Sequence, residues 1–353
     1  MYNIDGTFIN DTLRGVNLIS NKINIPNTQP SKTNTLESLQ LAGAIHKEVR
    51  RKIQPLIKPN MKLLDLTQYI EKETIELCKK YDNLTINKGI GFPAGLSLNN
   101  CAAHWAPSSN SNITFNYDDV LKIDYGVEIN GWIIDSAFTV TFNPKYDILL
   151  EAVKDATYTG MKNVGIDVLI PEWAESIREV MESYEINLND NMCSIKVIET
   201  LGGHNIKNGI IHGGIFLPGK DLGNRIPRNN RFQPGVYAIE TFGSTGINVT
   251  HEQGKATLFR LNPTFNPNVL KMDTVKKFYQ KVKNNFSTLP FCDRYIELID
   301  SKYNTYMDIL NKNNAIYSYP PLLVYDTDYT AQYEHTIYLD ETIKEICSQG
   351  EDY

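Results

Sequence analysis

The chain has 353 residues, of which 41% are hydrophobic and 22% are charged, so it can bury a large core without disulfides. Its net charge of −6 gives no basic field for nucleic acid or an anionic membrane. The five cysteines form no Cys-x-x-Cys pair, which argues against a disulfide framework or a thiolate zinc site and fits a reducing compartment. The start, MYNIDGTFIN, lacks signal-peptide features, and no apolar run approaches membrane-spanning length.

Residues 1–34 are polar and rich in Asn, Thr and Ser, which predicts an N-terminal arm. From Leu36 onward, apolar residues recur at three- and four-residue steps and predict an amphipathic helix that ends near Pro55. The segment KPNMKLLDLTQYIEKETIEL predicts a turn followed by a second helix. A Gly-rich stretch, GIGFPAGLSLNNCAAHWAP, then precedes the first strand-like runs.

Strands and helices alternate irregularly in the rest of the chain. Strand-like runs occupy 120–128, 132–142, 235–242 and 329–339, and helix-like runs occupy 148–165 and 171–186. Because there is no regular βαβ order, we expect an α+β fold with a mainly antiparallel sheet. Between about 262 and 325 apolar residues take helical spacing, which predicts a helical insertion between two strands of the sheet.

Two aspartates, Asp124 and Asp135, lie in strand-like runs where an unpaired carboxylate is costly. The Asn-Gly pair at 130–131 is a strong signal for a two-residue hairpin turn. That turn pairs Asp124 with Ala137 and Asp135 with Gly126, so the two carboxylates become diagonal neighbours on one face, about 7–8 Å apart at Cα. They could be solvated acids on an exposed edge, or they could converge on a shared proton or on metal ions.

Three more residues of ligand type favour metal ions. Glu240 lies in the strand-like GVYAIETF, and His204 lies between Gly-rich turns in LGGHNI. Glu334 shares a strand face with Gln332 and Thr336, whereas its neighbour His335 should point to the opposite face. Four carboxylates and one imidazole suit divalent ions such as Mn, Fe, Co or Zn. Four carboxylates are too many for one ion, so we predict two ions about 3.5–4 Å apart.

Several segments resemble those of type 2 methionine aminopeptidases: GFPAGLSLNNCAAHWAP, LKIDYGVEINGWIIDSAFTVTFNPKYD, GGHNIKNGIIHGG, VYAIETFGSTG, YSYPPL and AQYEHTIYL. The resemblance runs from about Leu36 to the terminal SQGEDY, and the five ligand types follow the family's order. It implies the pita-bread fold, in which two pseudo-symmetric halves with a curved antiparallel sheet surround a dinuclear site. We therefore expect a catalytic domain over 35–353, interrupted by the helical insertion at about 262–325.

The resemblance also implies a role for each ligand. Asp124 would hold the first ion, while Asp135 and Glu334 would bridge both ions. His204 and Glu240 would complete the second, and Glu240 would also take and pass on the proton of the attacking water. The implied activity is removal of the N-terminal methionine from nascent proteins, preferentially when the second residue is small. We accordingly predict a dinuclear methionine aminopeptidase of the cytoplasm that uses Co, Mn, Fe or Zn.

Two further histidines match the family's motifs. His104 would lie near the scissile amide, at the position that fumagillin-type inhibitors alkylate, and His212 would bond the substrate carbonyl and stabilise the oxyanion. The methionine side chain would lie in an apolar pocket. The resemblance assigns that pocket to Phe92, Ile211, Tyr319 and Leu322, although ordinary core packing would also explain each of them.

The sequence departs from the family at two points. It lacks the Lys- and Glu-rich N-terminal block of many eukaryotic members, which weakens the case for a ribosome partnership. Leu258 stands where the family commonly has a histidine near the pocket rim, so inhibitor affinity or substrate preference could differ.

Two other functions stay open. One is an Xaa-Pro peptidase of the same fold, which usually carries an extra N-terminal domain for which the polar segment 1–34 leaves no room. The other is a pita-bread protein that has lost ligands and binds nucleic acid or proteins instead, although all five ligand types are present here.

Overall fold

The computed structural model describes residues 12–26, 30–31, 34–81, 87–188 and 190–353. The predicted N-terminal arm, 1–34, therefore falls partly outside the described residues, at 1–11, 27–29 and 32–33. Its described part packs against the folded core, because Val16 and Ile19 are buried and Arg14 forms a β-bridge with Thr141.

The described residues form seven α-helices and five short 3₁₀ helices. The α-helices are α1 (Thr35–Ile53), α2 (Leu63–Cys78), α3 (Asp147–Asn163), α4 (Ile170–Met181), α5 (Asp273–Phe286), α6 (Asp293–Ile299) and α7 (Tyr303–Lys312). The 3₁₀ helices are Gln54–Leu56, Lys79–Tyr81, Pro144–Tyr146, Gly223–Arg225 and Pro267–Val269. The predicted first helix is confirmed as α1, whose N-cap Asn34 accepts a hydrogen bond from the Glu37 amide.

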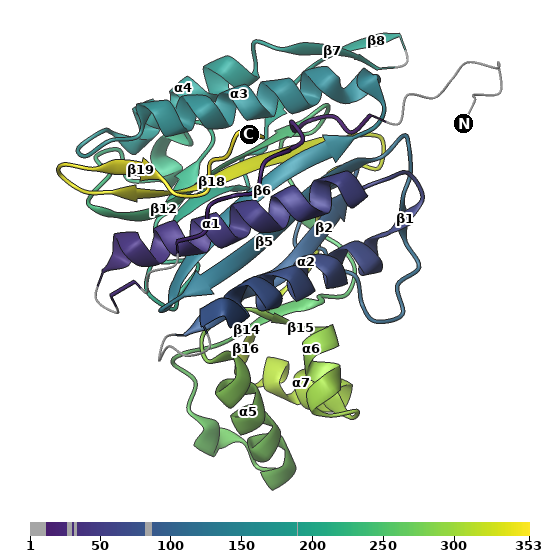
Figure 1. The fold of residues 1–353 in the computed structure, drawn as a ribbon, viewed down its shortest axis with the longest axis vertical. Coiled ribbons are helices and arrows are strands. Elements are labelled where there is room, and N and C mark those ends of the chain that lie inside the picture. Colours follow the sequence, from purple (N-terminus) through teal and green to yellow (C-terminus); the bar gives the residue numbers. More distant parts are fainter. Residues whose placement is uncertain (1–11, 27–29, 32–33, 82–86, 189) are drawn as a thin grey trace.

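Two antiparallel sheets form the centre of the molecule. The first has the strand order β2 (Lys88–Leu98), β5 (Val120–Ile129), β6 (Trp132–Thr141). The second has the order β11 (Phe216–Pro218), β10 (Gly202–Ile206), β12 (Gly235–Ser244), β18 (Thr330–Leu339), β19 (Lys344–Ile346), with β9 (Lys196–Val197) on β12. The sheets meet where β6 lies beside β18 (Figure 1). This arrangement confirms the predicted α+β class with a mainly antiparallel sheet.

The other strands form small sheets at the periphery. They are β3 (Cys101–Ala103) with β17 (Leu322–Leu323) and β13 (His251–Glu252), β14 (Leu258–Leu261) with β15 (Phe291–Cys292) and β16 (Ile316–Tyr319), β1 (Met61–Lys62) with β4 (Thr114–Phe115), and β7 (Glu185–Leu188) with β8 (Asn191–Ser194). Helices α5–α7 gather beside β14–β16 at the lower end of Figure 1, around a separate apolar cluster. The boundaries 35–353 and 262–325 stay predictions.

The hairpin of β5 and β6 has the predicted register. Asp124 pairs with Ala137, and Gly126 pairs with Asp135. Side chains alternate between faces along a strand, so Asp124 and Asp135 lie on the same face of the sheet. The sequence pattern and the Asn-Gly turn were therefore sufficient to place the two acids together.

The turn of this hairpin explains why its register is fixed. Asn130 and Gly131 have φ values of 54° and 84°, the left-handed pair that a two-residue type I′ turn requires. The Asn208 side chain lies so close that a Cβ on Gly131 would meet it at 2.5 Å, and its Nδ2 donates to the Asn130 carbonyl at 2.8 Å. A larger residue at position 131 would thus be strained by both its backbone and its neighbour.

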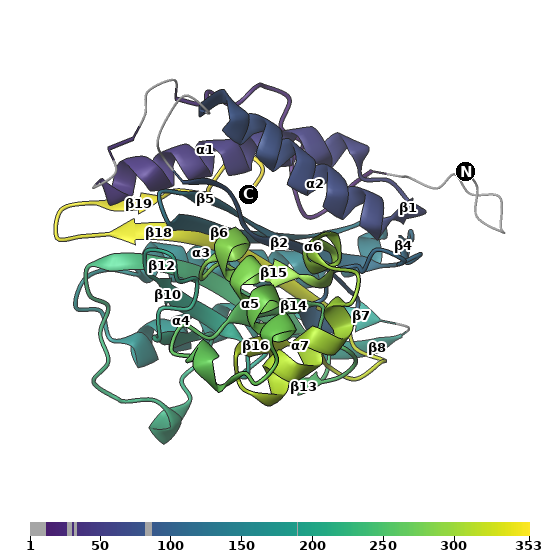
Figure 2. The same cartoon turned by 90° about the horizontal axis from the view of Figure 1, so that it is seen from below.

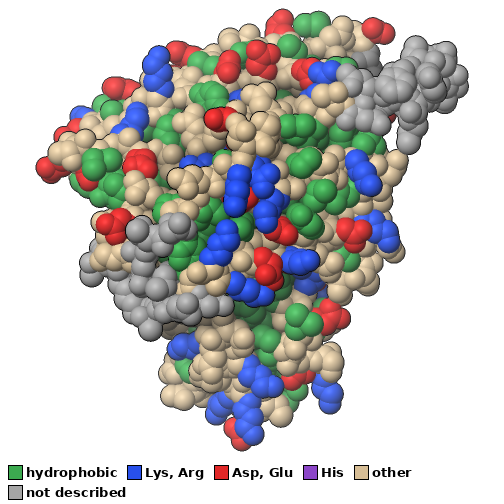
Figure 3. Space-filling model, viewed as in Figure 1, with side chains coloured by type: hydrophobic (Ala, Val, Ile, Leu, Met, Phe, Trp, Pro, Cys, Tyr) green, Lys and Arg blue, Asp and Glu red, His purple; other side chains and the backbone are tan. Residues whose placement is uncertain are grey.

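Helices α1 to α4 cover one face of the joined sheets. Helix α1 packs on β5 and β6, α2 on β2, and α3 on β12 and β18, as Figures 1 and 2 show. Residues of opposite parity to the acids face these helices: the Tyr125 ring stacks on His46 of α1, and Thr241 Oγ1 lies 2.8 Å from Thr157 Oγ1 of α3. The acids therefore point away from the helices. Figure 3 shows basic and acidic side chains interspersed over the helix-covered surface.

Candidate metal centre

The five predicted ligands come from five strands of the two central sheets and line one cavity of about 410 Å³. The strands are β5 for Asp124, β6 for Asp135, β10 for His204, β12 for Glu240 and β18 for Glu334. Their positions follow from strand pairing, because Glu240 lies directly opposite Glu334 in the β12–β18 ladder. Residues far apart in the sequence are thus brought together by the sheet.

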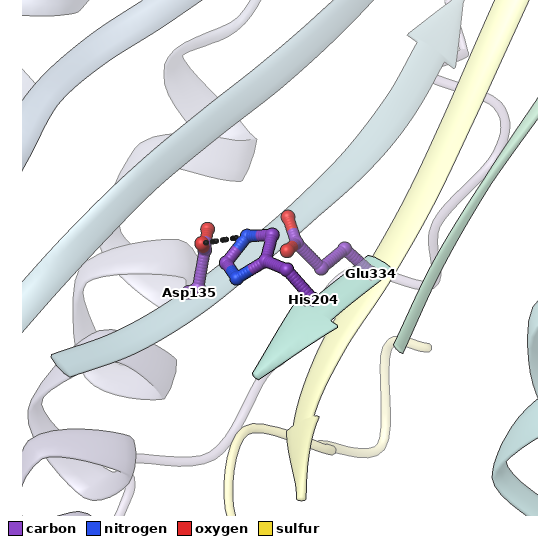
Figure 4. Close-up of side chains that lie close together, drawn as sticks. All are labelled: Asp135, His204 and Glu334. Atoms are coloured by element: carbon purple, nitrogen blue, oxygen red, sulfur yellow. Dashed lines mark ion pairs between the residues drawn. The ribbon is translucent and has the colours of Figure 1, made fainter. Parts of the chain in front are cut away.

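Asp135, His204 and Glu334 form the tightest part of the cluster. Each offers one ligand atom within 4.8 Å of the others, and Figure 4 shows their side chains pointing toward one another. His204 Nε2 lies 3.4 Å from Asp135 Oδ2 and 3.7 Å from Glu240 Oε1. One imidazole nitrogen is therefore directed at two carboxylates.

Burial and mutual repulsion disfavour the charged carboxylates. Burial raises the pKa of Asp124 well above its usual range, and the nearby Asp135 raises it further. The pKa values of Glu240 and Glu334 are likewise raised, first by burial and then by the neighbouring acids. Such a cluster holds extra protons unless a cation compensates its charge.

Among the described residues, no lysine or arginine forms an ion pair with Asp124, Glu240 or Glu334 within 4.0 Å. Lys122 also lines the cavity, but its Nζ donates to the Asn99 carbonyl at 2.7 Å. Burial lowers the pKa of Lys122 to about 7, so its charge is also disfavoured. Within the described part of the chain, the cluster therefore has no lysine or arginine as a counter-ion.

A divalent metal fits this environment. Asp124 Oδ1 and both carboxylate oxygens of Glu334 are buried without a hydrogen-bond partner. Unpaired buried oxygens are costly, and metal ions bind such carboxylate oxygens together with an imidazole nitrogen. The unpaired oxygens belong to Asp124 and Glu334, two of the five predicted ligands. They are therefore available to bind a hard or borderline divalent ion.

Gln332 belongs to this centre, although we did not predict a role for it. Its Nε2 lies 3.2 Å from Glu240 Oε2 and 3.5 Å from Asp124 Oδ2, so it donates toward two carboxylates from opposite sheets. The alternation along β18 had placed Gln332 on the face of Glu334, which was the available signal. An amide is not a common metal ligand, so its residue type did not draw attention.

The two predicted catalytic histidines flank the cluster. The His212 ring lies edge-on to His204, with ring centroids 4.5 Å apart, and 6.1 Å from the Tyr319 ring. The His104 ring lies 5.4 Å from Tyr319 on another side of the cavity. Burial lowers the pKa of His104 to about 4. The pKa of His212 is lowered by burial and then by the neighbouring His204 and His104.

The loop that carries His212 is fastened to the strand that carries His204. Asn205, next to His204, accepts from the Gly213 amide at 2.6 Å through its carbonyl and from the Ile215 amide at 2.8 Å through Oδ1. A Cβ on Gly213 would meet the Asn205 side chain at 2.7 Å. The GGHNI and IIHGG motifs therefore form one positioning unit.

Three of the four predicted pocket residues line the cavity: Phe92, Ile211 and Tyr319. The Phe92 ring lies over Gly126, where a Cβ would approach it to 2.4 Å, so the strand glycine makes room for the ring. Leu258 also lines the cavity, in agreement with its predicted place near the rim. The fourth predicted pocket residue, Leu322, is not among the described residues that line the cavity. Its strand partner Ala103 does line the cavity.

The remaining histidines lie away from the cavity. His335 points to the opposite face of β18, as predicted, and its Nδ1 lies 2.9 Å from Ser348 Oγ. His46 is buried in α1, with its Nε2 3.0 Å from the Tyr125 carbonyl oxygen. His251 is exposed on β13. These positions agree with leaving all three out of the predicted ligand set.

Comparison with known proteins identifies the family. The model of metallopeptidase family M24 matches residues 37–254, a segment that carries four of the five predicted ligands. The chain belongs to metallopeptidase family M24. This M24 metallopeptidase is 42% identical over 326 residues to methionine aminopeptidase 2 of Komagataella phaffii, covering 91% of this chain and 71% of the relative. It is also 42% identical over 315 residues to methionine aminopeptidase 2 of Saccharomyces cerevisiae, covering 88% and 74%. The resemblance to type 2 methionine aminopeptidases is thereby confirmed.

Solved structures confirm the pita-bread fold of this M24 metallopeptidase. A thermophilic Arx1 superposes with a TM-score of 0.75 at 18% identity, covering 89% of this chain and 91% of that one. Methionine aminopeptidase from Rickettsia prowazekii superposes with a TM-score of 0.59 at 16% identity, covering 89% and 97%. Membership of the family implies the use of divalent metal. No helix in the described part of the chain is long and apolar enough to cross a membrane.

Proposed function

We propose that this M24 metallopeptidase removes the N-terminal methionine from polypeptides with two divalent ions held by Asp124, Asp135, His204, Glu240 and Glu334. The observation that carries the proposal is the set of buried carboxylate oxygens without partners in the cavity. The methionine aminopeptidase 2 relatives, at 41–42% identity over most of the chain, support the substrate class. As the bridging ligands we propose Asp135 and Glu334, which lie with His204 in the tightest part of the cluster.

Each residue of the cavity has a chemical task in this proposal. When bound by these five residues, divalent ions would supply Lewis acidity and would lower the pKa of water toward neutrality. Glu240 accepts the proton of the attacking water and passes it to the departing amine, a role that suits a buried carboxylate beside the ligand cluster. An imidazole N–H of His212 donates to the oxygen of the scissile carbonyl as negative charge develops on it.

The cavity walls supply specificity. Phe92, Ile211 and Tyr319 give an apolar surface for the unbranched thioether of methionine. We propose that His104 and His212 crowd the position of the second residue, so that small side chains are preferred there. His104 faces the same cavity, which supports it as the residue that a fumagillin-type epoxide would alkylate.

A peptide pair tests the function. Metal-free protein is supplied in turn with Co²⁺, Mn²⁺, Fe²⁺ or Zn²⁺ and offered Met-Ala-Ser and Ala-Pro peptides. We expect release of methionine from the first peptide with at least one metal, and no cleavage of the second. Cleavage of the Ala-Pro peptide alone would instead identify an Xaa-Pro peptidase. A folded protein that takes up no metal and cleaves neither peptide would be a binding protein.

The source of the substrate is part of the proposal. Nascent polypeptides in the cytoplasm present N-terminal methionine, and the widely spaced cysteines suit that reducing compartment. Sedimentation of the protein with translating ribosomes, lost after puromycin release of nascent chains, would support action during synthesis. Cell fractionation that places the protein outside the cytoplasm would contradict the proposed location.

A further inference from the structure

The junction between the two central sheets has an unusual construction. Strands β6 and β18 lie side by side, yet among the described residues no backbone ladder pairs them. Side-chain hydroxyls join them instead. Thr336 Oγ1 of β18 accepts from the Asp135 amide at 2.7 Å and donates to the Asp135 carbonyl at 2.7 Å. A single hydroxyl therefore satisfies both backbone groups of a proposed bridging ligand.

The same device recurs in the opposite direction. Thr139 Oγ1 of β6 accepts from the Gln332 amide at 2.8 Å and donates to the Gln332 carbonyl at 2.7 Å. Between them, Ser136 Oγ donates to the Glu334 carbonyl at 2.7 Å and lies 3.0 Å from the hydroxyl of the C-terminal residue, Tyr353. We call Thr336, Thr139 and Ser136 the hydroxyl seam.

The hydroxyl seam is fully buried and fully bonded. The three residues have 0% exposure, so backbone groups at the junction have no access to water. Each threonine uses its one proton to donate and a lone pair to accept, which is the full pairing that a buried hydroxyl and two backbone groups require. The seam hydroxyls bond to the backbones of Asp135, Glu334 and Gln332, all of whose side chains line the metal cavity. In addition, Ser136 contacts the Tyr353 hydroxyl.

The seam also changes how the two strands are joined. In an ordinary ladder one N–H···O bond of about 2.9 Å joins the backbones and holds the strands about 4.8 Å apart. Here each link runs through a side chain instead. Both hydrogen bonds of the Thr336 hydroxyl go to Asp135, and the backbone of β18 is reached only through the covalent Cα–Cβ–Oγ1 bonds of Thr336.

We infer that the hydroxyl seam sets the separation and orientation of Asp135 and Glu334, which makes Thr336, Thr139 and Ser136 positioning residues for the metal centre. The inference rests on the proposed metal site. It predicts that removal of a seam hydroxyl lowers metal affinity more than its effect on folding would explain, because the ligands themselves remain in place.

Metal titration of isosteric variants tests this inference. Thr336→Val keeps the shape of the side chain but leaves the Asp135 backbone unpaired, whereas Thr336→Ser keeps the hydroxyl. Co²⁺ is titrated into metal-free protein and followed by its visible absorption, and folding is verified by circular dichroism. We expect Thr336→Val to lose about 10- to 100-fold in Co²⁺ affinity, the usual effect of removing a group that orients a ligand, and Thr336→Ser to recover most of it.

A second buried threonine provides the matched control. Thr157 Oγ1 of α3 donates to the Val153 carbonyl at 2.9 Å and is fully buried, but it touches β18 from the helix side at Tyr333. Thr157→Val should lower the unfolding midpoint while keeping wild-type Co²⁺ affinity. An equal loss of affinity in Thr157→Val and Thr336→Val, or no loss in Thr336→Val, would overturn the inference.

The remaining outcomes are also decisive. If Thr336→Val does not fold, Thr139→Val serves instead, because it unpairs Gln332 rather than a ligand, and unchanged Co²⁺ affinity there would overturn the inference. If the wild-type protein binds no Co²⁺, the metal site itself fails. If the wild-type protein binds Co²⁺ and the seam variants bind it with the same affinity, only the positioning role of the seam is rejected, and the metal site stands.

Discussion

Buried ionisable side chains lie on both faces of the joined sheets, but in the described part of the chain only the helix-covered face pairs a buried acid with a lysine or arginine. On the helix-covered face, the Arg50 guanidinium forms two hydrogen bonds of 2.9 Å with the Asp352 carboxylate and stacks over the Tyr353 ring at 4.4 Å. On the cavity face, Glu334 and Asp124 have buried oxygens without any partner. Among the described residues, Asp352 thus has a basic partner, whereas Glu334 and Asp124 have none.

The difference separates a structural role from a functional one. The Asp352 carboxylate also accepts from Gln54 Nε2 at 2.7 Å, and Arg50 Nη1 donates to the Ser348 carbonyl at 2.9 Å, so this network needs nothing from outside. A buried acid that is left unpaired by a fold able to pair others must find its partner elsewhere. A bound cation at Glu334 is the simplest such partner.

The largest effect should come from removing Asp135, one of the two proposed bridging ligands. We expect Asp135→Ala to abolish both stoichiometric metal uptake and methionine release. The reason is that a carboxylate oxygen of Asp135 lies within 4.8 Å of a ligand atom of both His204 and Glu334, so the three can share one ion. Metal content by mass spectrometry and hydrolysis of Met-Ala-Ser measure the two losses. Asp273→Ala, at an exposed acid in the first turn of α5, is the control. Ordinary turnover by Asp135→Ala would remove this residue from the site.

Breaking the paired network should instead cost stability. Asp352→Asn keeps the shape but leaves the buried Arg50 charge without its counter-charge, which costs about 3–5 kcal/mol. Urea unfolding measures this loss, and metal uptake of the folded variant should stay at the wild-type level. Asp221→Asn, which breaks an exposed pair with Arg228, should cost only about 0–1 kcal/mol. Equal costs for the two variants would mean that the helix-face network is not specially stabilising.

The histidines also differ between the two faces of the sheets. On the helix face, His46 and His335 form hydrogen bonds with Tyr125 and Ser348, whereas His212 lines the cavity. We expect His212→Ala to lower kcat about 100- to 1000-fold, which corresponds to an activation free energy higher by about 2.7–4 kcal/mol. KM should change little, because the variant removes a donor to the developing oxyanion. Steady-state kinetics on Met-Ala-Ser give both constants. His251→Ala, at the exposed histidine of β13, should leave them unchanged. An unaltered kcat in His212→Ala would exclude the proposed role.

Local patterns predicted those parts of the site that depend on strand geometry. The Asn-Gly turn and period-two alternation placed Asp124 beside Asp135, and alternation placed His335 on the far face of β18. These inferences held because a strand next to a buried face tolerates no shift of register. The identity of the family and its fold came from motif order, which composition alone could not supply.

Other features depend on contacts between distant segments. Arg50 and Asp352 are 302 positions apart in the sequence, and no local pattern predicts that these two residues form an ion pair. The hydroxyl of Thr336 was visible in the sequence as a polar residue on the face of Glu334, but its bonds to Asp135 depend on how the two sheets meet. Leu322 was placed in the pocket by resemblance alone, and in the structure it lies outside the cavity lining.

The pH dependence of stability is the most direct measure of the difference between the two faces, and it has an unusual sign. Burial raises the pKa of Glu334 in the folded protein, and the neighbouring Asp135, Glu240 and Asp124 raise it further. In the unfolded chain, a glutamate has a pKa of about 4.3. Between these two pKa values, the metal-free folded state keeps a proton that the unfolded state has released. The unfolding free energy therefore falls by about 1.4 kcal/mol per pH unit as pH rises through this window.

Glu334→Gln has no such proton, so without metal it should be more stable than the wild type at pH 7. The difference should vanish near pH 4, where glutamate is protonated in both states. Urea unfolding in the presence of chelator, at steps between pH 4 and pH 7, measures it. With Mn²⁺ in excess the order should reverse, because metal binding stabilises only the protein that keeps its bridging carboxylate. A metal-free wild type that is more stable than Glu334→Gln at pH 7 would show that Glu334 is paired within the chain, as Asp352 is.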